Sequence, residues 1–182
     1  MQRKSIIIMT ICLFLALNTT AQEEASVEKS IFGIQAGIMG IWANNEKKLS
    51  NTIALRSEIG FEMTGGTIND RKDAPIIPLV LTVEPRYYYD IKKRHSKGLR
   101  IDNNSATFIS VKISYHADWL MLSGKQPGNI QIMPTYAGRG CIGKHFNYEV
   151  GGGIGYQYTF TSIEKQKNDW SFNIVLRIGY TF

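Results

Sequence analysis

The stretch "WSFNIVLRIGYTF", residues 170–182, carries the pattern that decides the fold of this protein. Every second residue from Trp170 to Phe182 is aromatic or aliphatic, and most residues between them are small or polar. This period of two is typical of a β-strand with one apolar face. Because chain termini usually fray, an apolar strand that continues to the last residue predicts a terminus held in place by its surroundings.

The same alternation recurs along most of the chain, whereas helical periodicity is rare. In residues 51–63, Ile53 and Ile59 share one face, and Arg56 and Glu58 lie on the opposite face. Several such runs exceed the 5–6 residues of a usual globular strand and match the length of a tilted membrane strand. The pattern predicts seven strands with polar turns between them: residues 31–43, 51–63, 76–90, 107–121, 129–140, 146–160 and 170–182.

Alternation alone fits either a soluble barrel with its apolar face inward or a membrane barrel with that face toward lipid. Aromatic residues favour the membrane barrel, because they cluster near strand ends on or beside the apolar face, where membrane barrels carry aromatic girdles. These residues are Trp42, Tyr87, Tyr89, Trp119, Tyr156, Tyr158, Phe160, Trp170, Tyr180 and Phe182.

The beginning of the chain predicts export from the cytoplasm. Arg3 and Lys4 precede an apolar run that ends near a small-residue cleavage site, which is the pattern of a signal peptide over residues 1–21. We expect residues 22–30 to form a short N-terminal segment and residues 31–182 to form a single barrel domain. Cys141 would then be the one remaining cysteine, so no internal disulfide is expected.

Charge and composition argue against several functional classes. Without the signal peptide the chain has 19 basic and 15 acidic residues, a formal charge of +4, and much of the excess lies in residues 91–100. We interpret that segment as a solvated turn and expect no nucleic-acid partner, since basic residues there are not interleaved with exposed aromatics. No Cys or His residues stand at zinc-ligand spacing, and we expect no cofactor.

Three further motifs carry a resemblance to a known family: "LSNTIALRSEIGF" (49–61), "EPRYYYDIKKR" (84–94) and "IGKHFNYEVGGGIGY" (142–156). With the signal peptide and the terminal aromatic strand, the chain resembles the small outer-membrane β-barrel proteins of Gram-negative bacteria, in their flavobacterial form. The resemblance implies an all-β, antiparallel, up-and-down transmembrane barrel of eight strands in the outer membrane. It also implies insertion into outer-membrane lipid by the assembly machinery, with Tyr180 and Phe182 as the recognition signal, and it carries over no catalytic residue.

The sequence pattern leaves the strand count and the role of three glycines open. Single-chain bacterial barrels have an even number of strands, so either residues 22–30 contribute a further strand or one of the seven predicted strands is misread. Gly151, Gly153 and Gly155 fall on the interior face of their strand. They could make room for arginine side chains, or they could relieve crowding in a tightly curved sheet.

An eight-stranded barrel has an interior just wide enough for side chains to fill. Charged residues recur on the polar face of five strands, and charges removed from water need partners. We therefore predict a structural or interaction protein with a closed lumen, which recognises an unknown external ligand through loops at residues 64–75, 122–129 and 161–169. The predicted ionic network of the lumen comprises Arg56, Glu58, Glu62, Glu84, Arg86, Lys112, Glu149 and Arg177.

Two alternative functions remain. An outer-membrane lipid hydrolase would use a Ser and a His, and Ser114 and His116 are neighbours on one face, although by this count they face the interior. A soluble, lipocalin-like barrel would bind an apolar ligand inside and would require the apolar face to point inward.

Overall fold

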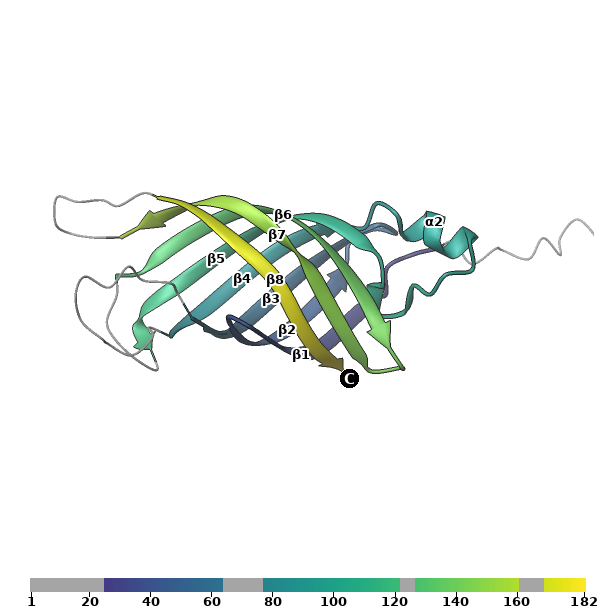
Figure 1. The fold of residues 1–182 in the computed structure, drawn as a ribbon, viewed down its shortest axis with the longest axis horizontal. Helices are drawn as coiled ribbons and strands as arrows, with labels where there is room; N and C mark the ends of the chain where they lie inside the picture. The colour runs from purple at the N-terminus through teal and green to yellow at the C-terminus, as the bar shows by residue number, and fades with distance from the viewer. Residues whose placement is uncertain (1–24, 64–76, 122–126, 161–168) are drawn as a thin grey trace, which may run out of the picture.

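The computed structural model describes residues 25–63, 77–121, 127–160 and 169–182, which form a closed antiparallel barrel (Figure 1). Each strand pairs with the next along the chain, and the last pairs with the first, so the predicted all-β, eight-stranded, up-and-down fold is confirmed. The predicted signal peptide, residues 1–21, lies outside the described residues. The strands are β1 (Ser30–Gly37), β2 (Gly40–Lys48), β3 (Ile53–Glu62), β4 (Pro78–Tyr87), β5 (Thr107–Met121), β6 (Asn129–Ile142), β7 (Phe146–Thr159) and β8 (Asp169–Thr181).

The eighth strand lies within residues 31–43, which the sequence analysis wrongly took as one strand. A two-residue turn at Ile38 and Met39 separates β1 from β2, and Gly37 pairs with Gly40 across it. At Gly40 a Cβ atom would collide with the carbonyl oxygen of Phe61, so glycine is required at this close approach. Because the chain reverses here, one continuous alternation cannot describe both strands.

The polar segment after Ala43 was also misread. Residues 44–51 were predicted to be a turn, but β2 continues to Lys48 and points Asn44 and Glu46 into the barrel. A strand that lines a polar interior carries polar residues that are easily mistaken for a loop. With β1 and β2 separated, both chain ends of the barrel lie at the same end, as an even number of strands requires.

The barrel wall is apolar outside and polar inside. Outward-facing Ile59 and Leu81 are 50% and 44% exposed, whereas inward-facing Arg56 and Glu84 are 0% and 3% exposed. Trp42 is an exception to the predicted aromatic girdle, because its ring points inward and is buried. Its position follows from the shift in alternation at the β1–β2 turn.

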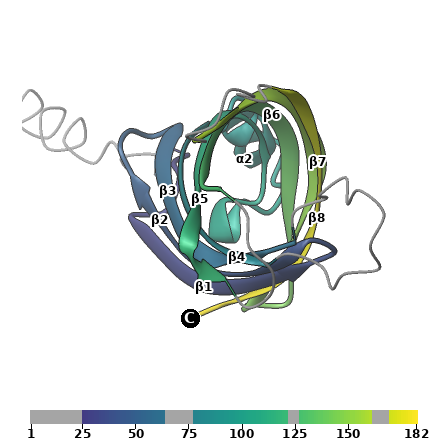
Figure 2. The same ribbon diagram turned by 90° about the vertical axis from the view of Figure 1, so that its left-hand side faces the viewer.

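One end of the barrel, here called the closed end, carries the segment between β4 and β5. This segment contains the short helix α2 (Ile91–Ser96) and the 3-10 turn η1 (Asp102–Asn104), and α2 is seen through the ring of strands in Figure 2. Residues 91–100, predicted to be a plain turn, therefore include a helix. Neither helix in the described residues is long and apolar enough to cross a membrane.

A small apolar core lies at the closed end. Tyr88, Ile91 and Phe108 are buried there against Val27, which precedes β1. The rings of Tyr88 and Phe108 lie 5.3 Å apart, centroid to centroid. Part of the predicted N-terminal segment thus belongs to the packing that fills the barrel mouth.

The interior glycines of β7 are explained by crowding. A Cβ atom at Gly151 would collide with the backbone and Cβ of neighbouring β6, and one at Gly155 would meet the backbone of β6. The nearest atoms belong to the adjacent strand and not to an arginine side chain. Close strand approach in the curved wall is therefore what these glycines permit.

Candidate functional site

All eight residues of the predicted ionic network point into the barrel and are buried. They come from β3, β4, β5, β7 and β8, and the strand alternation sets their direction. Six are linked by successive ion pairs or hydrogen bonds, whereas Glu62 and Lys112 form a separate pair nearer the far end, opposite the closed end. The linked residues are Arg56, Glu58, Glu84, Arg86, Glu149 and Arg177.

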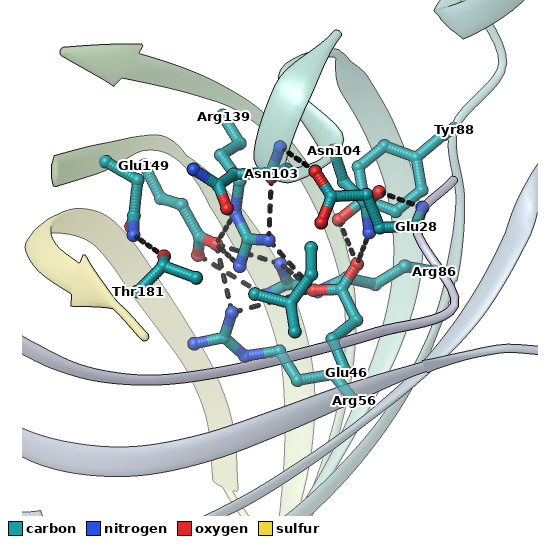
Figure 3. A network of polar contacts seen from close by, with 12 residues as sticks. Glu28, Glu46, Arg56, Arg86, Tyr88, Asn103, Asn104, Arg139, Glu149 and Thr181 are labelled. Atoms are coloured by element: carbon teal, nitrogen blue, oxygen red, sulfur yellow. Dashed lines mark hydrogen bonds and ion pairs between the residues drawn. The ribbon is translucent and has the colours of Figure 1, made fainter. Parts of the chain in front are cut away.

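Glu149 of β7 is the centre of the network (Figure 3). Its Oε1 accepts hydrogen bonds from Nη1 of Arg56 at 3.1 Å, Nη1 of Arg86 at 2.9 Å and Nε of Arg139 at 2.7 Å. These guanidinium groups come from three strands and converge on one fully buried carboxylate. Charge-assisted bonds of this kind are the strong ones in a protein interior.

A second carboxylate, Glu46 of β2, joins the network to the closed end. It lies 3.1 Å from Nη1 of Arg139 and accepts hydrogen bonds of 2.6 Å from the hydroxyl of Tyr88 and from Nδ2 of Asn104. Burial, together with the negative charge of Glu46, raises the pKa of Tyr88, which lies beyond the end of β4. The phenol therefore stays neutral, and its hydroxyl donates a hydrogen bond to Oε1 of Glu46.

The η1 segment is held by polar contacts as well. Asn103 and Asn104 both adopt positive φ angles, 52° and 56°, which Asn tolerates better than most residues. The backbone carbonyl of Asn103 accepts from Nη1 of Arg139 at 3.2 Å, and Oδ1 of Asn104 accepts from the backbone N–H of Glu28 at 2.8 Å. The connection between β4 and β5 is thus tied to both the wall and the network.

Ion pairs also extend from the network toward the far end. Glu58 accepts from Nε of Arg56 at 2.5 Å and from Nη1 of Arg177 at 2.8 Å. The guanidinium of Arg177 on β8 lies 3.9 Å from the ring centroid of Trp42 on β2, a cation–π contact between side chains of two strands that flank β1. The inward tryptophan therefore serves the packing of the lumen.

Two members of the network were missed by the sequence analysis. Glu46 was missed because its segment was interpreted as a turn. Arg139 could have been predicted, because it lies on the same face of its strand as Gln131 and Thr135. With both included, the described interior holds five buried basic and five buried acidic side chains. Such a balance leaves each charge near an opposite one, as burial requires.

The far end is packed less tightly. Nζ of Lys112 lies 3.7 Å from Oε2 of Glu62, which is too long for a hydrogen bond. Glu62 and His116 border a cavity of about 450 Å³, and neither Oε2 of Glu62 nor Nδ1 of His116 has a hydrogen-bond partner among the described residues.

The residues considered for hydrolysis face the interior. Ser114 is buried, and its Oγ lies 2.9 Å from Oγ1 of Thr82. His116 is buried on the same strand, near the cavity. The described residues also contain no cluster of three or more His, Cys, Asp or Glu side chains that could hold a metal ion.

The two residues of the predicted assembly signal lie on the outer wall at the closed end. Phe182 is 68% exposed and Tyr180 is 39% exposed. Their rings lie 5.4 Å apart, and Phe182 also lies 5.7 Å from the ring of Phe32 on β1. An aromatic patch thus covers the seam between β1 and β8.

Comparison of the chain with models of known protein families, with curated proteins and with solved structures gave no match. The geometry of the barrel itself therefore indicates what the protein can do. That geometry combines an apolar outer wall, a charge-filled interior at the closed end and a partly empty interior at the far end.

Proposed function

We propose that this protein is an integral outer-membrane β-barrel with a lumen closed by its own side chains. We further propose a structural or interaction role through the predicted external loops, most of whose residues lie outside the described ranges. The observation that carries the proposal is the orientation of the wall. Large apolar side chains such as Ile59, Leu81 and Ile113 are about half exposed, while charged side chains fill the interior. Lipid is the environment in which such a surface is stable.

The lipocalin-like alternative needs the opposite arrangement. It requires an apolar lumen for the ligand and solvated charges on the outer wall. Here Glu46, Arg56 and Glu149 are each 0% exposed inside the barrel, and the outer wall is an apolar belt. Contiguous apolar surface on this scale is rare on soluble monomers.

The filled lumen favours a structural role over transport. The network around Glu149 and the apolar core around Phe108 occupy the same end of the barrel, and each charge there has a partner. A steady pore would require a continuous water path past these groups. We therefore expect negligible ion conductance for the purified barrel in planar bilayers, and a steady channel of porin size would refute the closed lumen.

The location is tested by expressing the full chain in a Gram-negative host and separating the soluble, inner-membrane and outer-membrane fractions. We expect the protein in the outer membrane, resistant to salt and alkaline washing and released only by detergent. Recovery in the soluble fraction would refute the proposal.

The proposed assembly partner is tested at the terminal strand. We expect Phe182→Asp to lower the amount of assembled barrel in cells severalfold while changing the stability of the refolded barrel little, because Phe182 is largely exposed. The matched control is Ile142→Asp, which alters an exposed apolar residue at the same end of β6, a strand separated from β8 by β7. Equal losses for the two variants would show that Phe182 acts only as part of the apolar belt.

A further inference from the structure

The barrel wall is incomplete on one side at the far end. β1 pairs with β8 only where residues 33–37 lie opposite residues 177–181. The pairing stops there because the chain turns back at Ile38 and Met39 to begin β2. Residues 169–176 of β8 are paired with β7 but have no partner in β1 (Figure 1). Eight strand residues span about 26 Å, so a substantial part of this edge of β8 has no neighbouring strand among the described residues.

The cavity of about 450 Å³ lies at this gap. Ile38 and Met39 of the hairpin turn line one side of it, and Phe172 and Ile174 of β8 line the other. Since Phe172 and Ile174 otherwise belong to the apolar outer wall, the cavity connects the interior with the side of the barrel. Its volume falls in the range of small-molecule binding sites.

The inner surface of the cavity is polar and incompletely satisfied. Glu62 and His116 are 7% and 5% exposed, yet Oε2 of Glu62 and Nδ1 of His116 accept or donate no hydrogen bond among the described residues. Gln131 and Ser171, by contrast, are joined by a 2.6 Å hydrogen bond. Unpaired polar atoms at buried positions are uncommon and point to a missing partner.

The charges at the cavity constrain what that partner can be. Glu62 disfavours an anionic head group, and Lys112, 3.7 Å from Glu62, disfavours a cationic one. A head with hydroxyl groups suits both, because a hydroxyl can donate to a carboxylate and accept from an amide or ammonium group. The apolar residues at the side opening suit an alkyl chain.

We propose that this cavity binds an amphiphile with an uncharged polyol head and a single alkyl chain, of the monoacylglycerol type. The head lies against Glu62 and His116, and the chain leaves the barrel between the β1–β2 turn and β8. Entry from surrounding lipid rests on the proposed membrane location. Binding itself does not, because it is measured on the purified barrel.

The three histidines provide the test. His116 borders the cavity, whereas His95 lies in α2 and His145 in the turn after β6, both at the closed end. The full-length barrel, purified in detergent with isotope-labelled histidine, is titrated with monododecanoylglycerol and followed by NMR. We expect saturable shifts of the His116 ring resonances while those of His95 and His145 stay fixed. Equal shifts for all three, or no saturable shift, would overturn the proposal.

The side opening is tested by Ile38→Trp, which places a large ring on an exposed turn residue beside the cavity. We expect at least tenfold weaker binding. The matched control is Ile178→Trp, which alters an exposed isoleucine of β8 where that strand is paired with β1, and should leave binding unchanged. Equal binding by Ile38→Trp and the control would refute the proposed route for the chain.

The head-group preference is tested with dodecanoate, which has an anionic head. We expect it to bind at least tenfold more weakly than the monoacylglycerol, and Glu62→Gln to reduce that difference. Dodecanoate binding as tightly as the polyol, with no effect of Glu62→Gln, would overturn the assignment. Membrane fractionation is a separate measurement, so failure of the proposed location and failure of this site are distinguishable.

Discussion

The two ends of the barrel interior use the same kinds of residue in different ways. At the closed end, Glu149 receives three guanidinium groups and lies above an apolar core. At the far end, the ion-pair partner of Glu62 among the described residues is Lys112, 3.7 Å away, and Glu62 borders a cavity. A buried carboxylate therefore stabilises the fold where its partners surround it, and becomes available to a ligand where they do not.

The largest expected effect comes from removing the two carboxylates in turn. Glu149→Ala should lower the free energy of unfolding by about 3–5 kcal/mol, because it leaves several buried guanidinium groups without their shared partner. Glu62→Ala should cost less than about 1 kcal/mol, since a polar cavity of this size admits water that can solvate Lys112. Urea unfolding of the barrel refolded into lipid vesicles measures both values. Similar costs would show that the two ends are packed alike.

A double-mutant cycle sharpens the same comparison. Arg86 donates from Nη2 to Oε2 of Glu84 at 2.8 Å, so Glu84→Ala and Arg86→Ala should be coupled by about 0.5–3 kcal/mol. The corresponding cycle for Glu62 and Lys112 should give less than about 0.5 kcal/mol, the limit for independent sites. Strong coupling in the second pair would mean that the cavity end contributes to stability as the closed end does.

Alkaline pH should act on the closed end through Tyr88. Because burial raises its pKa, the folded barrel retains a proton that the unfolded chain releases above about pH 10. Stability that is complete below pH 10 should then decrease as pH rises, by at most about 1.4 kcal/mol per pH unit for this one group.

The role of Tyr88 is tested by comparing how the free energy of unfolding changes with pH in wild type and in Tyr88→Phe. Tyr88→Phe should be less stable at pH 7, because it loses the hydrogen bond to Glu46, but should lose less stability between pH 9 and pH 12. Tyr156→Phe, which removes an exposed hydroxyl on β7, is the matched control. Parallel pH curves for wild type and Tyr88→Phe would contradict the role given to Tyr88.

The smallest effect concerns backbone protection along β8. Amides of residues 169–176 that point toward the β1 side should exchange with deuterium faster than those of residues 177–181, which are paired with β1. Amides of the same strand that point toward β7 serve as the internal reference, because pairing with β7 runs along nearly the whole strand. Uniform protection across β8 would mean that its free edge is covered.

Much of the barrel was predictable because local alternation directly reports which way a strand residue points. The alternation of polar and apolar residues alone assigned Arg56, Glu58 and Glu149 to the interior, and all three side chains are buried there. The alternation predicted the wrong strands between residues 31 and 48. A two-residue turn reverses the chain there without the polar residues that usually mark a turn. Trp42 and Glu46 were misplaced for that reason.

The sequence by itself determined the fold class and the sidedness of each long strand, since both follow from a period of two and need no knowledge of distant residues. Only the tertiary structure decided which charges meet. Arg56 and Glu149 are 93 residues apart in sequence, and their 3.1 Å contact depends on the closure of the ring and on its strand register. The cavity likewise arises because β1 is shorter than the β8 strand it pairs with, which no local pattern contains.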